Sequence, residues 1–135
     1  MSPAEPSQLL ALIVEDNPDN LLLTQAVLRR AGYRTAQAQS AEEALERVKE
    51  AVPDVILMDI QLPGQDGLSL TRLLKADPTT AHVPVVALSA HAMQESRQLA
   101  KDAGCDGYIT KPINTRMFAS QLSEALSSAN QTGSA

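Results

Sequence analysis

An uninterrupted apolar run at residues 55–58 ends in the carboxylate Asp59, and this feature constrains the fold more than any other part of the sequence. Pro53 and the Pro63-Gly64 pair bound the run on its two sides. A short apolar run between turn residues is typical of a strand that is buried on both faces, as in parallel sheets covered by helices. Such a strand brings Asp59 to the carboxyl edge of the sheet, where open α/β folds place their chemistry.

Four further strand-like segments alternate with five helix-like segments. We expect strands at residues 9–14, 33–38, 83–88 and 106–110, and helices at residues 18–31, 40–51, 67–76, 92–103 and 114–126. This alternation through short links predicts an α/β fold, a doubly wound parallel sheet with right-handed crossovers and helices on both faces. We expect one domain at residues 9–126, between flexible tails at residues 1–8 and 127–135.

Helical periodicity predicts which side chains of each helix face the sheet. The expected inward residues are Leu21, Leu23, Val27, Leu28 and Ala31 in the first helix, Ala44, Leu45, Val48 and Val52 in the second, Leu70, Leu73 and Leu74 in the third, and Phe118, Leu122, Ala125 and Leu126 in the last. Leu22 falls on the opposite side of the first helix, beside Gln25 and Arg29. Ser40 with Glu43 forms a capping-box pattern for the second helix, and Asn114 is expected to cap the last.

The composition excludes several classes of function. The chain has 135 residues, a formal net charge of −5, and 2% aromatic residues with no Trp. Negative charge opposes binding to nucleic acid or anionic membranes, and stacking on bases needs aromatic side chains that are scarce here. No segment has the length of a membrane span, and residues 1–8 do not resemble a signal peptide. We therefore expect a cytoplasmic protein without nucleic-acid or membrane partners, whose single cysteine, Cys105, forms no intramolecular disulfide.

Polar side chains follow the apolar runs at four expected strand ends: Glu15-Asp16, Asp59, Ser89 and Lys111. Clustered carboxylates repel one another and need protons or a cation, and an all-oxygen set without His or Cys suits Mg²⁺. The lysine and the hydroxyl are donors that a phosphoryl group requires, so Asp59 is equipped to attack a phosphoryl donor and become an acyl phosphate. Each residue alone has an ordinary alternative, as a loop acid, a solvated lysine or a helix-capping serine, and the hypothesis rests on their joint arrival at one edge.

Four blocks of the sequence resemble the signature motifs of the CheY-like response-regulator receiver domain. They are Ile13-Val14-Glu15-Asp16-Asn17, Ile56-Leu57-Met58-Asp59 with Leu62-Pro63 and Asp66-Gly67, Val86-Ala87-Leu88-Ser89-Ala90, and Tyr108-Ile109-Thr110-Lys111-Pro112. The resemblance covers roughly residues 9–126. Within it, the sequence is most similar to DivK-type single-domain regulators and to receiver modules of hybrid histidine kinases. It implies a flavodoxin-like (βα)5 sheet with the strand order 2-1-3-4-5.

The resemblance also implies a function in two-component signal transduction. Asp59 would accept a phosphoryl group from a histidine kinase or a histidine phosphotransfer protein, and the domain would then signal by docking to an unidentified protein target. Catalysis would be limited to Mg²⁺-dependent self-phosphorylation from small donors and self-dephosphorylation, so the protein would not be an enzyme in the usual sense. A monomer or a weak phosphorylation-dependent dimer is expected.

Further residue roles follow from the same resemblance. Mg²⁺ would be bound directly by Asp16 and Asp59, through water by Glu15, and by the backbone carbonyl of Gln61. The phosphoryl group would accept a hydrogen bond from Ser89 and pair with Lys111, Tyr108 would change rotamer, and the Lys111-Pro112 peptide bond would be cis. The phosphodonor protein is expected to dock on the exposed side of the first helix, because the apolar Leu22 lies there beside the polar Gln25 and Arg29 and next to the expected phosphorylation site. The resemblance supports this expectation.

Three positions bear on the details of the expected site. Gln65 stands where the family usually has an apolar residue, so the packing of its loop is expected to differ. Gln61 and His91 lie two residues beyond Asp59 and Ser89, at positions that tune dephosphorylation in the family. The ordinary interpretation of His91 is a solvated residue in the first turn of a helix, and we leave both interpretations open.

Three other functions share parts of this pattern. A flavodoxin-like FMN carrier has the same strand order, but it needs a phosphate cradle where this chain has the acids Glu15 and Asp16. A phosphatase of the haloacid dehalogenase type also phosphorylates a strand-end aspartate, but it needs a second acid where Gln61 stands. A scaffold that keeps only the receiver fold would have no use for the complete set of acids, hydroxyl and lysine.

Overall fold

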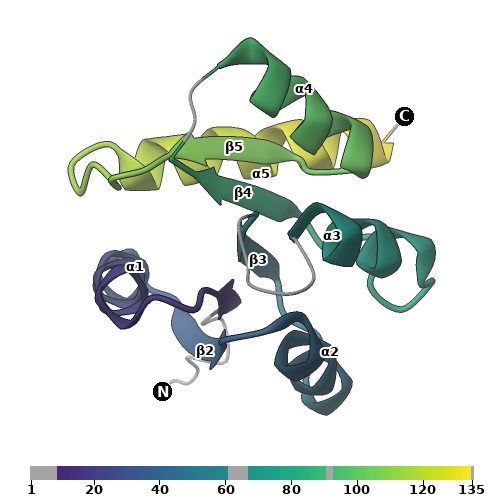
Figure 1. The fold of residues 1–135 in the computed structure, drawn as a ribbon, viewed down its shortest axis with the longest axis horizontal. Helices are drawn as coiled ribbons and strands as arrows, with labels where there is room; N and C mark the ends of the chain where they lie inside the picture. The colour runs from purple at the N-terminus through teal and green to yellow at the C-terminus, as the bar shows by residue number, and fades with distance from the viewer. Residues whose placement is uncertain (1–8, 61–66, 91–92, 135) are drawn as a thin grey trace.

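A single five-stranded parallel sheet forms the centre of the protein, with strand order β2-β1-β3-β4-β5 (Figure 1). The computed structural model describes residues 9–60, 67–90 and 93–134, with side chains up to residue 127. The strands are β1 (Leu10–Val14), β2 (Arg34–Ala38), β3 (Val55–Asp59), β4 (Val85–Ser89) and β5 (Gly107–Thr110). The helices are α1 (Pro18–Arg30), α2 (Ala41–Glu50), α3 (Gly67–Ala76), α4 (Gln94–Ala103) and α5 (Phe118–Ser134). The predicted α/β fold and its strand order are confirmed.

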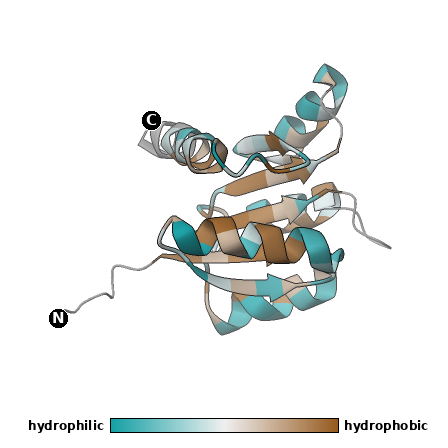
Figure 2. Cartoon of the chain, turned by 90° about the vertical axis from the view of Figure 1, so that its left-hand side faces the viewer, coloured by the Kyte–Doolittle hydropathy of each residue, from teal (hydrophilic) through white to brown (hydrophobic). Residues whose placement is uncertain are grey.

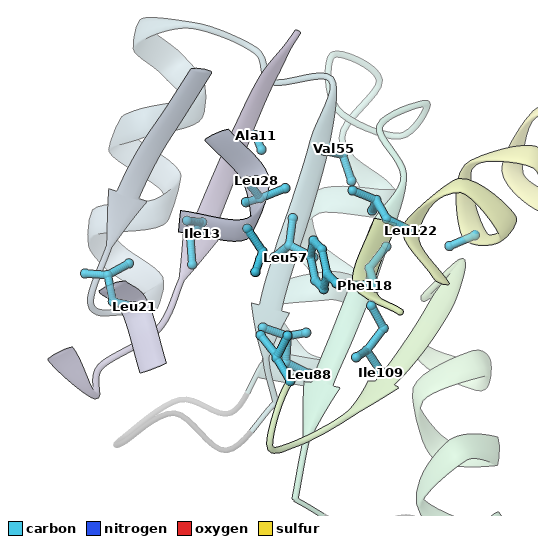
Figure 3. Close-up of a cluster of buried hydrophobic side chains, with 14 residues drawn as sticks. Ala11, Ile13, Leu21, Leu28, Val55, Leu57, Leu88, Ile109, Phe118 and Leu122 are labelled. Carbon is cyan, nitrogen blue, oxygen red and sulfur yellow. The ribbon is translucent and has the colours of Figure 1, made fainter. Parts of the chain in front are cut away.

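The sheet separates two apolar layers, because successive side chains of a strand point to opposite faces. Ala11, Ile13, Leu57 and Leu88 pack with residues of α1 and α5, including Leu28, Phe118 and Leu122 (Figure 3). Leu12, Val14, Ile56 and Met58 pack on the other face with residues of α2 and α3, including Ala44, Val48, Leu70 and Leu74. The central strands are accordingly mostly hydrophobic, while the helices mix hydrophobic and hydrophilic residues (Figure 2).

The register of the sheet aligns the ends of the central strands. Val14 of β1 pairs with Met58 of β3, and Asp59 pairs with Leu88 of β4. All five residues of β3 and of β4 are buried, as the uninterrupted apolar run predicts. The polar residues that follow these strands therefore emerge together at one edge.

Local capping explains why α1 begins directly after that edge. The Asn17 side chain accepts hydrogen bonds from the backbone N–H groups of Asp19 (2.9 Å) and Asn20 (3.2 Å), and Pro18 occupies the first helical position. At α2, Ser40 Oγ accepts from the Glu43 N–H at 3.1 Å, as the capping-box pattern predicts.

Several predicted boundaries differ from the structure. β4 begins at Val85 rather than at residue 83, because the Val83 N–H bonds back to the Thr80 carbonyl instead of to a neighbouring strand. α4 begins at Gln94, two residues later than predicted. Asn114 accepts from the N–H groups of Arg116 and Met117 and caps a turn that precedes α5, and α5 itself begins at Phe118.

The last helix also ends later than predicted. α5 continues to Ser134, whereas the sequence predicts an end near residue 126. Extending an existing helix adds one hydrogen bond for each residue fixed, so polar residues of modest propensity can prolong it. The predicted flexibility of residues 127–135 stays a prediction.

Three predictions of inward-facing residues are wrong. Ala31 and Val52 are exposed because α1 and α2 end before them, and Leu73 lies on the outer face of α3. Conversely, Thr24 and Thr71 are buried in α1 and α3. Their hydroxyls donate to the carbonyls of Asn20 and Gly67, both at 2.8 Å, so burial leaves neither hydroxyl unsatisfied. Among the residues described, none of the helices combines the length and apolar character needed to cross a bilayer.

Candidate functional site

Glu15, Asp16 and Asp59 meet at the carboxyl edge of the sheet, between the ends of β1 and β3. One carboxylate oxygen from each residue lies within 4.8 Å of the others. The chain leaves β1 toward β2 on one side and continues from β3 to β4 on the other, so this point is the topological switch of the sheet. Open α/β folds form their ligand sites at such a point, because the connections diverge there and leave a crevice.

Burial makes the three acids unequal. Glu15 and Asp59 are only 1% and 3% exposed, whereas Asp16 is exposed. Lys111 opposes the two buried acids, with its Nζ 3.0 Å from Glu15 Oε1 and 3.3 Å from Asp59 Oδ2. Among the residues that the structure describes at this edge, one cation thus faces three carboxylates, which gives an excess of negative charge.

Electrostatics at Glu15 reflects this excess. Burial raises the pKa of the Glu15 carboxyl, and the hydrogen bond and the negative charge of Asp59 raise it further. Lys111 acts in the opposite direction, but it does not cancel the effect of burial. The site therefore favours a proton or a second cation close to Glu15.

Two backbone features bring Lys111 and Ser89 to this edge. Ser89 ends β4 beside Thr110 of β5, and the Lys111 N–H donates to the Ser89 carbonyl at 2.7 Å. The Lys111-Pro112 peptide bond is cis, as the family resemblance implies. Ser89 is fully buried at the end of β4.

The donor set is compatible with a hard divalent cation. Its three members offer carboxylate oxygens within 4.8 Å of one another, without a nitrogen or sulfur ligand. Mg²⁺ prefers oxygen ligands, keeps several waters and binds phosphoryl oxygens. The clustered acids, of which one is exposed, thus have the chemistry and the access that Mg²⁺ requires.

Tyr108 lies half-buried on β5, and Arg97 of α4 covers its ring. The Arg97 guanidinium carbon is 4.9 Å from the ring centroid, and its Nη2 lies 3.5 Å from Thr110 Oγ1. The two residues also border an open groove of about 580 Å³ between α4 and β5. Sequence reasoning missed Arg97, because the periodicity of α4 does not show which side chain reaches the neighbouring strand.

The predicted docking residues lie on the outer side of α1. Leu22 is 64% exposed, and Arg29 is exposed as well. Gln25 is partly buried, and its Nε2 donates to Gln37 Oε1 of β2 at 2.8 Å. Gln61, Gln65 and His91 lie outside the described residues.

Comparison with known proteins decides the family. The model of the response regulator receiver domain family matches residues 11–123 of this chain. The chain belongs to this family. As a receiver domain it is 41% identical over 118 residues to the polar-differentiation response regulator DivK of Brucella abortus (strain 2308), covering 87% of this chain and 96% of DivK.

Solved receiver domains share the fold. The CheY-like receiver domain protein of Methanospirillum hungatei is 28% identical, with a TM-score of 0.80, covering 93% of this receiver domain and 99% of that chain. The receiver domain of a sensor histidine kinase from Pseudomonas aeruginosa is 34% identical, also with a TM-score of 0.80, covering 90% and 99% of the two chains. That crystal structure has a magnesium ion coordinated in its active-site cleft. The predicted resemblance to receiver domains, both single and kinase-linked, is therefore confirmed.

Proposed function

We propose that Asp59 is the phosphoacceptor of this response regulator receiver domain and that its donor is the phosphohistidine of a histidine kinase or phosphotransfer protein. The observation that carries the proposal is the position of Asp59, which ends the central strand inside the acid cluster and lies 3.3 Å from Lys111 Nζ. In the transfer, an Asp59 oxygen forms a bond to phosphorus, the phosphorus–nitrogen bond breaks, and the imidazole leaves and takes up a proton.

Mg²⁺ is the cofactor of the proposed reaction. Asp16 and Asp59 would bind it directly, Glu15 through water, and the Gln61 backbone carbonyl would add a ligand, as the resemblance implies. When bound, Mg²⁺ supplies positive charge that offsets the carboxylates and the incoming phosphoryl oxygens. The exposure of Asp16 supports this assignment, because one side of the cluster remains open to a cation and its waters.

Lys111 and Ser89 complete the proposed site. Lys111 would pair with the phosphoryl group as its charge arrives at Asp59, and Ser89 would donate a hydrogen bond to it. Tyr108 would respond through the pairing of β4 with β5, in which Ser89 lies beside Thr110, and would change the surface bordered by α4 and β5. That surface would then bind a downstream protein. The receiver domain would also catalyse its own dephosphorylation.

An FMN carrier is not favoured. Glu15 and Asp16 stand where a flavodoxin-like protein holds a phosphate group, and their charge would repel it. A scaffold without phosphorylation is a poorer explanation, because burying the charges of Glu15 and Asp59 opposite Lys111 costs free energy. Apolar residues at these positions would stabilise the same fold at least as well.

Labelling with acetyl phosphate tests the assignment of Asp59. We expect the intact mass to rise by one phosphoryl group in the presence of Mg²⁺, and the gain to disappear in Asp59→Asn and when Mg²⁺ is chelated. Asp16→Ala should weaken Mg²⁺ binding, measured by calorimetry or by amide chemical shifts. A stable phosphoryl mass on Asp59→Asn would refute the assignment.

Two phosphodonors separate docking from chemistry. Leu22→Ala should slow transfer from a phosphotransfer protein while leaving acetyl phosphate labelling unchanged, because Leu22 is exposed on α1 and does not belong to the acid cluster. Leu99→Ala is a matched control, since Leu99 is 54% exposed on α4. Equal slowing with both donors would mean that the site itself had changed.

A further inference from the structure

Gly67 begins α3 in direct contact with the backbone that carries Asp59. A methyl group at this position would lie 2.5 Å from the Asp59 carbonyl oxygen, 2.6 Å from Ile60 Cα and 3.0 Å from Met58 Cγ. Non-bonded carbon atoms normally stay about 3.5–4.0 Å apart. The positive-φ glycines of the described chain are Gly32 and Gly104, so Gly67 is required for space and not for an unusual backbone conformation.

Helix α3 is anchored firmly at positions away from this contact. Leu70 and Leu74 are buried in the apolar layer that α3 shares with β3. At the far end, Lys75 Nζ binds Asp106 Oδ2 at 2.9 Å and the Val83 carbonyl at 2.8 Å. Moving α3 outward would disturb all of these contacts.

The strand end opposite Gly67 is held less firmly. The pairing of β3 with β1 ends at Met58, whereas the pairing with β4 continues to Asp59 and Leu88. Beyond it, the Ile60 N–H donates to the Leu88 carbonyl at 3.2 Å, and the Ile60 carbonyl accepts from the Gly67 N–H at 3.3 Å. An added side chain at position 67 would therefore shift Asp59 and Ile60 more easily than it would shift α3.

We propose that Gly67 is a positioning residue for phosphoryl transfer: its lack of a side chain lets α3 seat against the Asp59 backbone and fixes the Asp59 carboxylate relative to Lys111 and Asp16. This inference rests on the proposed role of Asp59. The contact between Asp59 and Lys111 spans 3.3 Å, so a shift of a few tenths of an ångström at the backbone changes it directly. Misplacement of a reacting group by about 1 Å can cost a factor of about 100 in rate.

The chain offers a matched control in Gly107. A methyl group there would lie 2.5 Å from Ala125 Cβ of α5, so its shortest contact is as close as the shortest contact at Gly67. Gly107 begins β5, however, at the edge of the sheet opposite to the acid cluster. Gly107→Ala should therefore cost stability without moving Asp59.

The test compares wild type, Gly67→Ala and Gly107→Ala under the same conditions. Stability is measured by urea unfolding, acetyl phosphate labelling by intact mass, and Mg²⁺ affinity by amide chemical shifts without any phosphodonor. We expect Gly67→Ala to label at least about tenfold more slowly and to bind Mg²⁺ more weakly, while Gly107→Ala labels and binds like wild type. If Gly67→Ala is unfolded in buffer, all three proteins are measured in sucrose, which favours the compact state.

Two outcomes would overturn the inference. One is labelling and Mg²⁺ affinity of Gly67→Ala within twofold of wild type. The other is equal slowing in Gly67→Ala and Gly107→Ala, which would make the effect one of stability alone. Failure of wild type to label at all would refute the proposed function instead, and the Mg²⁺ titrations would still decide whether Gly67 positions the acids.

Discussion

Asp59→Asn should stabilise the metal-free protein, although Asp59 is nearly fully buried and ion-paired. The substitution keeps the size of the side chain and removes one of the three negative charges that lie together at the carboxyl edge. Lys111 keeps its partner Glu15 at 3.0 Å, so the cation is not left alone. The expected gain in unfolding free energy follows from the attractions and repulsions between the charges of the wild-type site.

The distances allow this balance to be approximated. At 3.3 Å, the attraction between Lys111 and Asp59 is about 5 kcal/mol at an effective dielectric constant of about 20. Repulsion from an acid within 4.8 Å is at least about 3.5 kcal/mol on the same scale, for Glu15 and for Asp16. Solvent around the exposed Asp16 reduces the repulsion between Asp16 and Asp59 by about half. The repulsion of Asp59 by the two other acids then roughly cancels its attraction to Lys111. Burial of the Asp59 charge adds a cost of several kcal/mol for an ion.

We therefore expect Asp59→Asn to gain about 2 kcal/mol in urea unfolding at pH 8 with a chelator, and about 6 °C in melting temperature. In millimolar Mg²⁺, the difference in unfolding free energy between Asp59→Asn and wild type should become smaller, because the cation stabilises wild type more than a variant that lacks one ligand. Glu46→Gln is a control, since exposed Glu46 lies on α2 and its loss should change stability by less than about 0.5 kcal/mol. A less stable Asp59→Asn in the presence of chelator would refute the reasoning.

Three further predictions follow from described contacts. Burial raises the pKa of Glu15, so the folded state binds this proton more tightly than the unfolded state. Metal-free stability should then fall as pH rises above the ordinary value of 4.5, and Glu15→Gln should remove this slope in urea unfolding across pH. Lys75→Met leaves the partly buried Asp106 carboxylate without its cation and should cost about 1–3 kcal/mol in urea unfolding, with acetyl phosphate labelling unchanged. Arg97→Met removes a contact worth about 0.5–1 kcal/mol, so stability should change little while the Tyr108 ring signals shift in NMR spectra; unshifted signals would mean that Arg97 does not constrain the ring.

The sequence predicted the edge of the sheet better than it predicted the helices. The apolar run before Asp59 and the polar residues that follow the other runs place the acid cluster, because parallel strands carry their carboxyl ends to one side. Lys111 could be assigned to that edge on the same grounds. The pairing of Ser89 with Thr110 follows from the order of the strands, which the family resemblance implies.

Helix faces and inter-helix contacts were harder to predict for a physical reason. Periodicity assumes that a helix continues through the window, and Val52 lies past the end of α2, so the pattern misplaced it. Leu73 belongs to α3 but lies outside its buried side, which Leu70, Thr71 and Leu74 occupy. The approach of Gly67 to Asp59 depends on how deeply a helix seats on the sheet, and no local pattern encodes that depth.

The strand order has a consequence for the newly made chain. Glu15, Asp16 and Asp59 are all synthesised before β4 and β5, which come later in the sequence and end in Ser89 and just before Lys111. A chain that stops growing at residue 60 therefore carries the mutually repelling acids without the lysine that opposes them. The apolar cover supplied by α5 comes later still. A chain that ends at residue 60 thus lacks both the cation and the packing that hold the acids together in the folded protein.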